Sequence, residues 1–188
     1  MAETEPLFPV PPFHHELLRG VASYGYELFT AHPDLDVVYV PIGCGSGICG
    51  TIAARDALGA KARVVGVVSE RAQTAKLSAE AGQMIETPDA LTFADGMAVR
   101  VPVQAALDIY GPGADHIGTV SEDDIATAIR LYYTATHNLA EGAGAAALAL
   151  ALKEREQLQG RKVGLILSGG NIDAAWFRSV LAGEVPQA

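Results

Sequence analysis

Apolar and polar residues follow one another along the chain in a pattern typical of strands that alternate with helices. Short apolar runs, rich in β-branched residues, predict four strands, at residues 37–42, 63–68, 116–120 and 162–167. Longer segments with apolar residues at helical spacing predict seven helices, at residues 14–30, 48–58, 71–81, 103–110, 121–137, 143–157 and 174–181. This alternation predicts a three-layer α/β fold, in which helices cover both faces of a parallel sheet.

Proline, glycine and serine mark the expected boundaries of these elements. Four prolines fall within residues 6–12, so residues 1–12 are expected to form an extended lead-in. Gly111-Pro112-Gly113 predicts the end of the fourth helix, and Ser121 with three acids behind it predicts the start of the fifth. Residues 13–188 are expected to form a single domain.

Composition and charge exclude several classes of function. Of the 188 residues, 49% are hydrophobic, which is ample for a packed core, and the net charge is −9. A chain this negative is repelled by nucleic acids and anionic membranes, so neither partner is expected. The sequence shows no apolar run that predicts a membrane span and no basic start that predicts a secretory signal. Two cysteines, Cys44 and Cys49, are too few for a disulfide framework or a structural zinc site and suit the cytoplasm.

The glycine-rich segment Gly43-Cys44-Gly45-Ser46-Gly47 follows the first predicted strand and leads into a helix. Such a loop presents successive backbone amides to an anion, and the helix N-terminus adds positive potential. Glycine suits the loop because a side chain would block the ligand and because some positions require a positive φ. The segment therefore predicts a phosphate cradle, with a tight turn that binds nothing as the alternative.

A dinucleotide site is a second interpretation of the same loop. Residues 45–50 also fit the pattern G-x-G-x-x-G, and Glu70 lies 20 residues beyond Gly50, where an acid would contact a ribose. Against this interpretation, the loop comes after a helix, about 40 residues into the chain, and no nicotinamide-site signature follows.

Two other segments place a polar side chain among small residues. Ser168 and Gly169 follow the last predicted strand, at the edge of the sheet where open α/β folds bind ligands. An ordinary strand exit with an Asx turn at Asn171 explains them equally well. Glu141 precedes the alanine-rich helix, where it either caps the helix or lies beside a flat ligand.

These three segments and Phe93-Ala94-Asp95-Gly96 occur in the order found in the threonine/serine dehydratases, which the chain resembles over residues 12–173. Those proteins are fold-type-II, tryptophan synthase β-like enzymes that use pyridoxal 5′-phosphate. The resemblance implies part of the large domain of that fold, with a mostly parallel sheet. It also implies a lyase that converts L-threonine or L-serine into a 2-oxo acid and ammonia.

The resemblance assigns cofactor contacts to eight residues, which are Gly43, Cys44, Gly45, Ser46, Gly47, Glu141, Ser168 and Gly169. The loop would hold the cofactor phosphate, although the family's usual loop has glycine where this chain has Cys44 and Ser46. The hydroxyl of Ser168 would pair with the pyridine nitrogen. Some relatives bind a divalent cation after the second strand, but Val68, Ala72 and Thr74 stand there in this chain, so no metal is expected.

The Schiff-base lysine of the family lies in a Ser-x-Lys-x-Arg motif ahead of the matched region. The four lysines of this chain lie outside such a motif and are interpreted as surface residues; they are Lys61, Lys76, Lys153 and Lys162. No catalytic residue is therefore assigned, and the chain is expected to be a truncated or split portion, inactive alone. The chain is expected to form a homo-oligomer or to join a partner chain that carries the missing segment, and a non-catalytic binding domain is the alternative.

Overall fold

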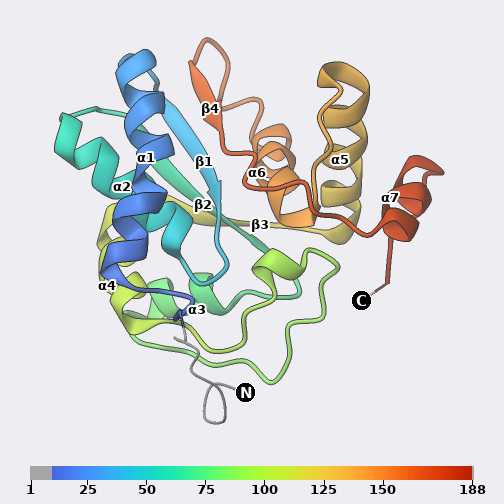
Figure 1. Cartoon of the computed structure of the whole chain (residues 1–188), viewed down its shortest axis with the longest axis horizontal. Helices are drawn as coiled ribbons and strands as arrows, with labels where there is room; N and C mark the ends of the chain where they lie inside the picture. The colour runs from blue at the N-terminus through green and yellow to red at the C-terminus, as the bar shows by residue number, and fades with distance from the viewer. Residues whose placement is uncertain (1–9, 188) are drawn as a thin grey trace.

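A four-stranded parallel sheet lies at the centre of residues 10–187, the part of the chain that the computed structural model describes (Figure 1). Its strands are β1 (Val37–Pro41), β2 (Arg63–Ser69), β3 (His116–Val120) and β4 (Val163–Leu165). They lie in the order β3-β2-β1-β4, and every neighbouring pair is parallel. All five residues of β1 are buried, as expected for a central strand with both faces covered.

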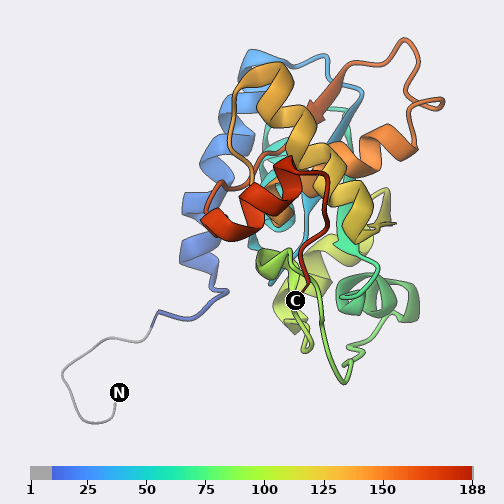
Figure 2. The same ribbon diagram turned by 90° about the vertical axis from the view of Figure 1, so that its right-hand side faces the viewer.

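Helices cover the two faces of the sheet, so the predicted three-layer α/β class is confirmed (Figures 1 and 2). One face packs on α1 (His15–Ala31), α2 (Ser46–Leu58), α3 (Thr74–Ala81) and α4 (Gln104–Gly113). The other packs on α5 (Glu122–Thr136), α6 (Gly142–Lys153), α7 (Ala174–Leu181) and the short 3₁₀ helix η1 (Asp95–Met97). Successive strand residues serve opposite cores, with Tyr39 packing on the second group and Val40 on the first.

Several predicted boundaries are wrong. The fourth helix continues through Pro112 to Gly113, because a proline in the last turn removes only one helical hydrogen bond and Gly111 before it has no Cβ to clash. The alanine-rich helix α6 ends at Lys153, and the chain continues in turns through residue 157. The last strand pairs with β1 over only three residues, which is shorter than the predicted 162–167.

The start of α5 agrees with its prediction in detail. Ser121 Oγ accepts a hydrogen bond from the backbone N–H of Asp124 (3.1 Å), and the Asp124 carboxylate accepts one from the N–H of Ser121 (2.9 Å). This reciprocal capping box satisfies two free donors at the helix start.

Most of the predicted lead-in, residues 1–12, lies outside the described part of the chain. Between residues 10 and 187 no helix is both long and apolar enough to cross a membrane.

Candidate functional site

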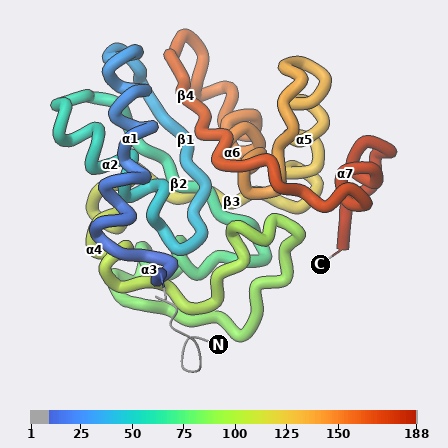
Figure 3. The backbone as a smooth tube through the Cα atoms, viewed as in Figure 1, coloured from blue at the N-terminus to red at the C-terminus, as the bar shows by residue number. Residues whose placement is uncertain are grey.

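The predicted phosphate cradle connects β1 to α2 at the carboxyl edge of the sheet (Figure 3). The helix begins at Ser46, two residues earlier than predicted, so Ser46 and Gly47 belong to its first turn. Gly45 is the N-cap residue, with a φ of +97°. That conformation strains any residue with a side chain, so glycine is required at this position.

The backbone N–H groups of residues 43–48 donate no hydrogen bond to any residue in the range 10–187. Before them, the N–H of Ile42 bonds to the carbonyl of Val67 (2.8 Å), and after them the N–H of Cys49 bonds to the carbonyl of Gly45 (3.0 Å). A helix start leaves its first amides without helical partners and carries partial positive charge. Six consecutive free donors at such a point are suited to an anion.

Glycines in this loop also permit close packing on its two sides. A Cβ on Gly43 would lie 2.2 Å from the carbonyl oxygen of Gly96, in η1, and a Cβ on Gly45 would lie 2.7 Å from the Cβ of Ala106, in α4. In Figure 3 the green segment between α3 and α4, which contains η1, lies alongside the loop that follows β1. The helices η1 and α4 therefore fix the shape of the cradle from its two sides.

The cradle lines a hollow of about 680 Å³ at the carboxyl edge of the sheet. The hollow is lined by residues from α1, the end of β1, the cradle, η1, the start of α6 and the end of β4, namely Gly20, Val21, Tyr24, Leu28, Pro41, Gly43, Cys44, Gly45, Ser46, Gly47, Gly96, Ala143, Leu165, Ile166, Leu167 and Ser168. Six of the eight sequence-predicted contact residues thus lie on one hollow, the five of the loop and Ser168.

The other two predicted residues, Glu141 and Gly169, lie outside that lining. Glu141 is the N-cap residue of α6, but its side chain does not cap the helix. Its carboxylate accepts a hydrogen bond from the N–H of Asn171 (3.1 Å) and lines a separate hollow of about 380 Å³ with Asp95. Burial raises the pKa of Glu141. The negative charge of Asp95 also raises this pKa, and the hydrogen bond from Asn171 lowers it in part.

Gly169 lies against Glu141. A Cβ on Gly169 would approach Glu141 Oε1 to 2.5 Å, and the carbonyl of Gly169 accepts a bond from the N–H of Glu141 (3.1 Å). Glu141 and Gly169 therefore join the start of α6 to the loop that follows β4, next to Ser168. Within residues 10–187 the side-chain oxygen of Asn171 accepts no backbone N–H, as an Asx turn would require, and the N–H of Asn171 donates to Glu141.

Comparison with known proteins agrees with this geometry. Residues 1–169 match the protein family described as pyridoxal-phosphate dependent enzyme. The chain belongs to this family. An L-threonine ammonia-lyase from Geobacter sulfurreducens is 36% identical over 166 residues, which are 87% of this chain and 41% of the relative. An L-threonine ammonia-lyase from Thermotoga maritima is 33% identical over 165 residues, again 87% of this chain and 41% of the relative.

A solved structure of the processed form of threonine deaminase isoform 2 from Solanum lycopersicum superimposes with a TM-score of 0.90 at 28% identity. It covers 97% of this chain, and the matched part is 52% of that protein. The chain therefore spans about half, or less, of the length of these relatives. Membership of this pyridoxal-phosphate dependent family also decides against a dinucleotide module, and Glu70, the acid that module needs, is paired with Lys153 (3.6 Å).

Sequence reasoning missed Tyr24 as part of the site. Its hydroxyl extends from α1, donates to the carbonyl of Gly47 (2.8 Å) and pairs with Thr51 Oγ1 (3.1 Å). Burial raises the pKa of Tyr24, so the phenol stays protonated and holds the first turn of α2. Helical spacing alone identifies this tyrosine only as a packing residue, because its partners belong to another helix.

The four lysines contribute nothing to the lining of the hollow. Lys162 pairs with Asp34, Lys76 pairs with Glu80, and Lys153 pairs with Asp124 and Glu70. Lys61 is exposed at the turn before β2. Their positions agree with the interpretation of all four as surface residues.

Proposed function

We propose that this chain is the cofactor-binding portion of a pyridoxal-phosphate-dependent ammonia-lyase that acts on L-threonine or L-serine. The observation that carries the proposal is the run of free amides at residues 43–48, at the start of α2. Amide donors bind a phosphate dianion through charge-assisted hydrogen bonds, and the helix dipole contributes about 0.3–1 kcal/mol more. These local interactions act at contact distance, whereas the net charge of −9 is spread over the molecule and is screened beyond about 10 Å.

The residues present fit the cofactor. Gly43 and Gly45 let the loop pack against Gly96 and Ala106, which sets its shape, and the loop residues line the hollow that a phosphate would enter. The hollow of about 680 Å³ lies within the usual size range of small-molecule sites. Ser168, exposed at the end of β4, would offer its hydroxyl to the pyridine nitrogen.

When bound, pyridoxal phosphate supplies an electron sink for charge that develops at the substrate Cα. The part of this chain is to hold the phosphate, orient the ring and exclude water with Val21, Leu165 and Leu167. A neutral hydroxyl at Ser168, in place of a carboxylate, would leave the ring nitrogen unprotonated. That arrangement gives a weaker electron sink and favours loss of the β-hydroxyl over transfer of the amino group.

The amine that must take the Cα proton is assigned outside this sequence, because no lysine of the chain lines the hollow. We place it on a lysine-bearing segment of a longer polypeptide or of a partner chain. Residues 13–188 would then be the large domain of the complete enzyme. Assembly into an oligomer and a cytoplasmic location stay predictions.

The test is an amide NMR titration of the 188-residue chain with pyridoxine 5′-phosphate, which lacks the aldehyde that labels surface lysines. Resonances of residues 43–48 are expected to shift, and inorganic phosphate should compete. Gly45→Val should abolish the shifts because valine resists the φ of +97° and would collide with Ala106, so the loop amides must move.

The matched control is Gly59→Val, at the other end of α2. Gly59 also has a positive φ, of +63°, but nothing lies within 4 Å of its added Cβ. It should therefore bind the ligand as the parent chain does. Shifts that map away from residues 43–48, or a Gly45→Val protein that titrates normally, would show that the cradle is not a phosphate site.

A further inference from the structure

Glu122 is a carboxylate buried at the first position of α5, with 7% of its surface exposed. Its Oε1 accepts hydrogen bonds from Ser69 Oγ (2.8 Å) and Thr92 Oγ1 (2.8 Å), and its Oε2 accepts one from the N–H of Phe93 (2.9 Å). All three donors are neutral, and a buried carboxylate is costly unless it is well hydrogen-bonded. The helix start does not need this acid, because Ser121 and Asp124 already cap it.

What Glu122 holds is the segment that leads into η1. Thr92 Oγ1, bound to Glu122, itself accepts a hydrogen bond from the N–H of Ala94 (3.1 Å). The carbonyl of Ala94 then accepts one from the N–H of Met97 (2.8 Å). Residues 92–97 are therefore anchored through one carboxylate, which also fastens them to Ser69 at the end of β2.

Residues 92–97 in turn form one wall of the cradle. The carbonyl of Gly96 lies so close to Gly43 that a Cβ there would approach it to 2.2 Å. On the other side, a Cβ on Gly142 would lie 2.6 Å from the Cα of Ala94. Because backbone packs directly on backbone at both points, a shift of this segment must move Gly43 or α6.

We propose that Glu122 is a positioning residue for the phosphate cradle: it fixes residues 92–97 and, through Gly96, the place of the first free amide, at Gly43. The inference rests on the proposed function for the identity of the ligand. It places Glu122 outside the lining of the hollow, so its effect on binding passes entirely through the wall it holds.

The experiment compares Glu122→Ala with Glu122→Gln. Alanine leaves the N–H of Phe93 and two buried hydroxyls without their shared partner. We therefore expect the Gly43 and Gly96 resonances to shift in the ligand-free chain, and inorganic phosphate to bind about tenfold more weakly. Glutamine keeps an oxygen for Phe93 and an NH₂ that can donate to the hydroxyls, so it should restore most of the affinity.

Two controls separate positioning from general stability. Asp123→Ala removes an exposed acid from the same helical turn and should leave phosphate binding unchanged. Val180→Ala opens a cavity in the same core but removes none of the hydrogen bonds to Glu122, so it should lower Tm without weakening phosphate binding. If Glu122→Ala does not fold, Thr92→Val removes one of its three contacts and makes the same test in a smaller step.

The outcomes are distinguishable. If the parent chain binds phosphate at residues 43–48 and Glu122→Ala binds it equally well, the positioning role is overturned and the proposed function stands. Loss of binding in Val180→Ala, in proportion to its loss of Tm, would likewise reduce Glu122 to a structural residue. If the parent chain binds no phosphate, the proposed function fails, and the ligand-free resonances of Gly43 and Gly96 still decide whether Glu122 sets the wall.

Discussion

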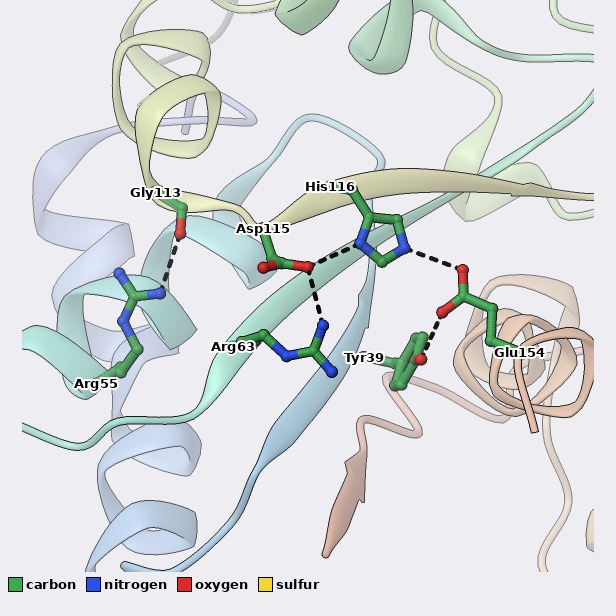
Figure 4. Close-up of polar contacts among 7 residues, drawn as sticks. All are labelled: Tyr39, Arg55, Arg63, Gly113, Asp115, His116 and Glu154. Atoms are coloured by element: carbon green, nitrogen blue, oxygen red, sulfur yellow. Dashed lines mark hydrogen bonds and ion pairs between the residues drawn. The ribbon is translucent and has the colours of Figure 1, made fainter. Parts of the chain in front are cut away.

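The two edges of the sheet use polar groups in opposite ways. At the carboxyl edge, the backbone donors of residues 43–48 have no partner within the described residues 10–187. At the amino edge, side chains pair in a continuous series (Figure 4). Contacts join Arg63 to Asp115 (3.3 Å), Asp115 to His116 (3.0 Å), His116 to Glu154 (2.9 Å) and Glu154 to the hydroxyl of Tyr39 (2.6 Å). The carboxyl edge therefore has backbone donors without partners in residues 10–187, whereas paired side chains at the amino edge link the strands to helix α6.

The charge state of the amino-edge series follows from its geometry. Both ring nitrogens of His116 face a carboxylate oxygen, an arrangement that needs two N–H donors and hence the protonated ring. Burial alone lowers the pKa of His116, but hydrogen bonds to Asp115 and Glu154 outweigh it, so the pKa is raised. Burial and the nearby Glu154 both raise the pKa of Tyr39, which therefore remains a donor.

Substitution of Gly43 should produce the largest loss of unfolding free energy and should disturb the carboxyl edge while leaving the amino edge intact. Gly43→Ala places a Cβ 2.2 Å from a backbone carbonyl that has no room to yield, so we expect a loss of about 1–3 kcal/mol in unfolding free energy. Phosphate binding should fall with it. Gly20→Ala, on the same hollow, has nothing within 4 Å and sits in a helix, so it should stabilise the chain by up to about 1 kcal/mol. Urea unfolding and a phosphate titration of both variants check the contrast.

Glu154→Ala should change the amino edge alone: the unfolding free energy should fall, and phosphate affinity should stay the same. Its side chain is 17% exposed and is the partner of both Tyr39 and His116. Its removal leaves the hydroxyl of Tyr39 unpaired, at a cost of about 1–3 kcal/mol. Glu156→Ala, an exposed acid two residues further on, should cost less than about 0.5 kcal/mol. A weaker phosphate affinity in Glu154→Ala would mean that the two edges are coupled.

The carboxyl edge could be predicted from the sequence more fully than the amino edge, for a physical reason. Gly43 to Gly47 and Ser168 lie at the ends of strands whose apolar pattern is plain, so their shared edge follows from parallel topology. The bond between Tyr39 and Glu154 instead joins residues 115 positions apart, through side chains that strand and helix periodicity do not place.

Similar limits explain the other missed residues. Glu122 sits in a run of three acids, which is typical of any helix start, and only the packing of residues 92–97 against it makes it different from its neighbours. Those residues show no helical or strand period, so neither η1 nor its contact with Gly43 could be predicted. The place of Glu141 beside the cofactor stays a prediction, and its hydrogen bond from the N–H of Asn171 is a contact that the sequence pattern does not indicate.

A pH series sharpens the comparison at the amino edge. The pKa of His116 is raised on folding, so the protonated ring contributes to the unfolding free energy. This contribution is fully present below the ordinary histidine pKa of about 6.5 and is lost as pH rises through the folded pKa. With the side chain 39% exposed, solvent screening limits the effect to less than about 1 kcal/mol. Unfolding free energies measured between pH 6 and 9 should show this loss in the parent chain.

The control for that series is His116→Gln, which cannot titrate. Its unfolding free energy should depend less on pH over the same interval. The other charged groups near this position are kept in the variant, namely Asp115, Arg63, Lys76 and Glu80. Parallel pH profiles for the two proteins would mean that His116 does not carry the dependence.

The smallest expected effect belongs to Ser168→Ala, which tests the proposed contact between the Ser168 hydroxyl and the cofactor ring. Ser168 is exposed, and its hydroxyl makes no hydrogen bond within residues 10–187, so unfolding free energy should change by less than about 0.5 kcal/mol. One hydrogen bond to the pyridine nitrogen is worth about 0.5–1.5 kcal/mol, so affinity for pyridoxine 5′-phosphate should fall by about two- to tenfold. Inorganic phosphate, which has no ring, should bind equally to both proteins. Equal losses for the two ligands would instead assign Ser168 to the phosphate end of the hollow.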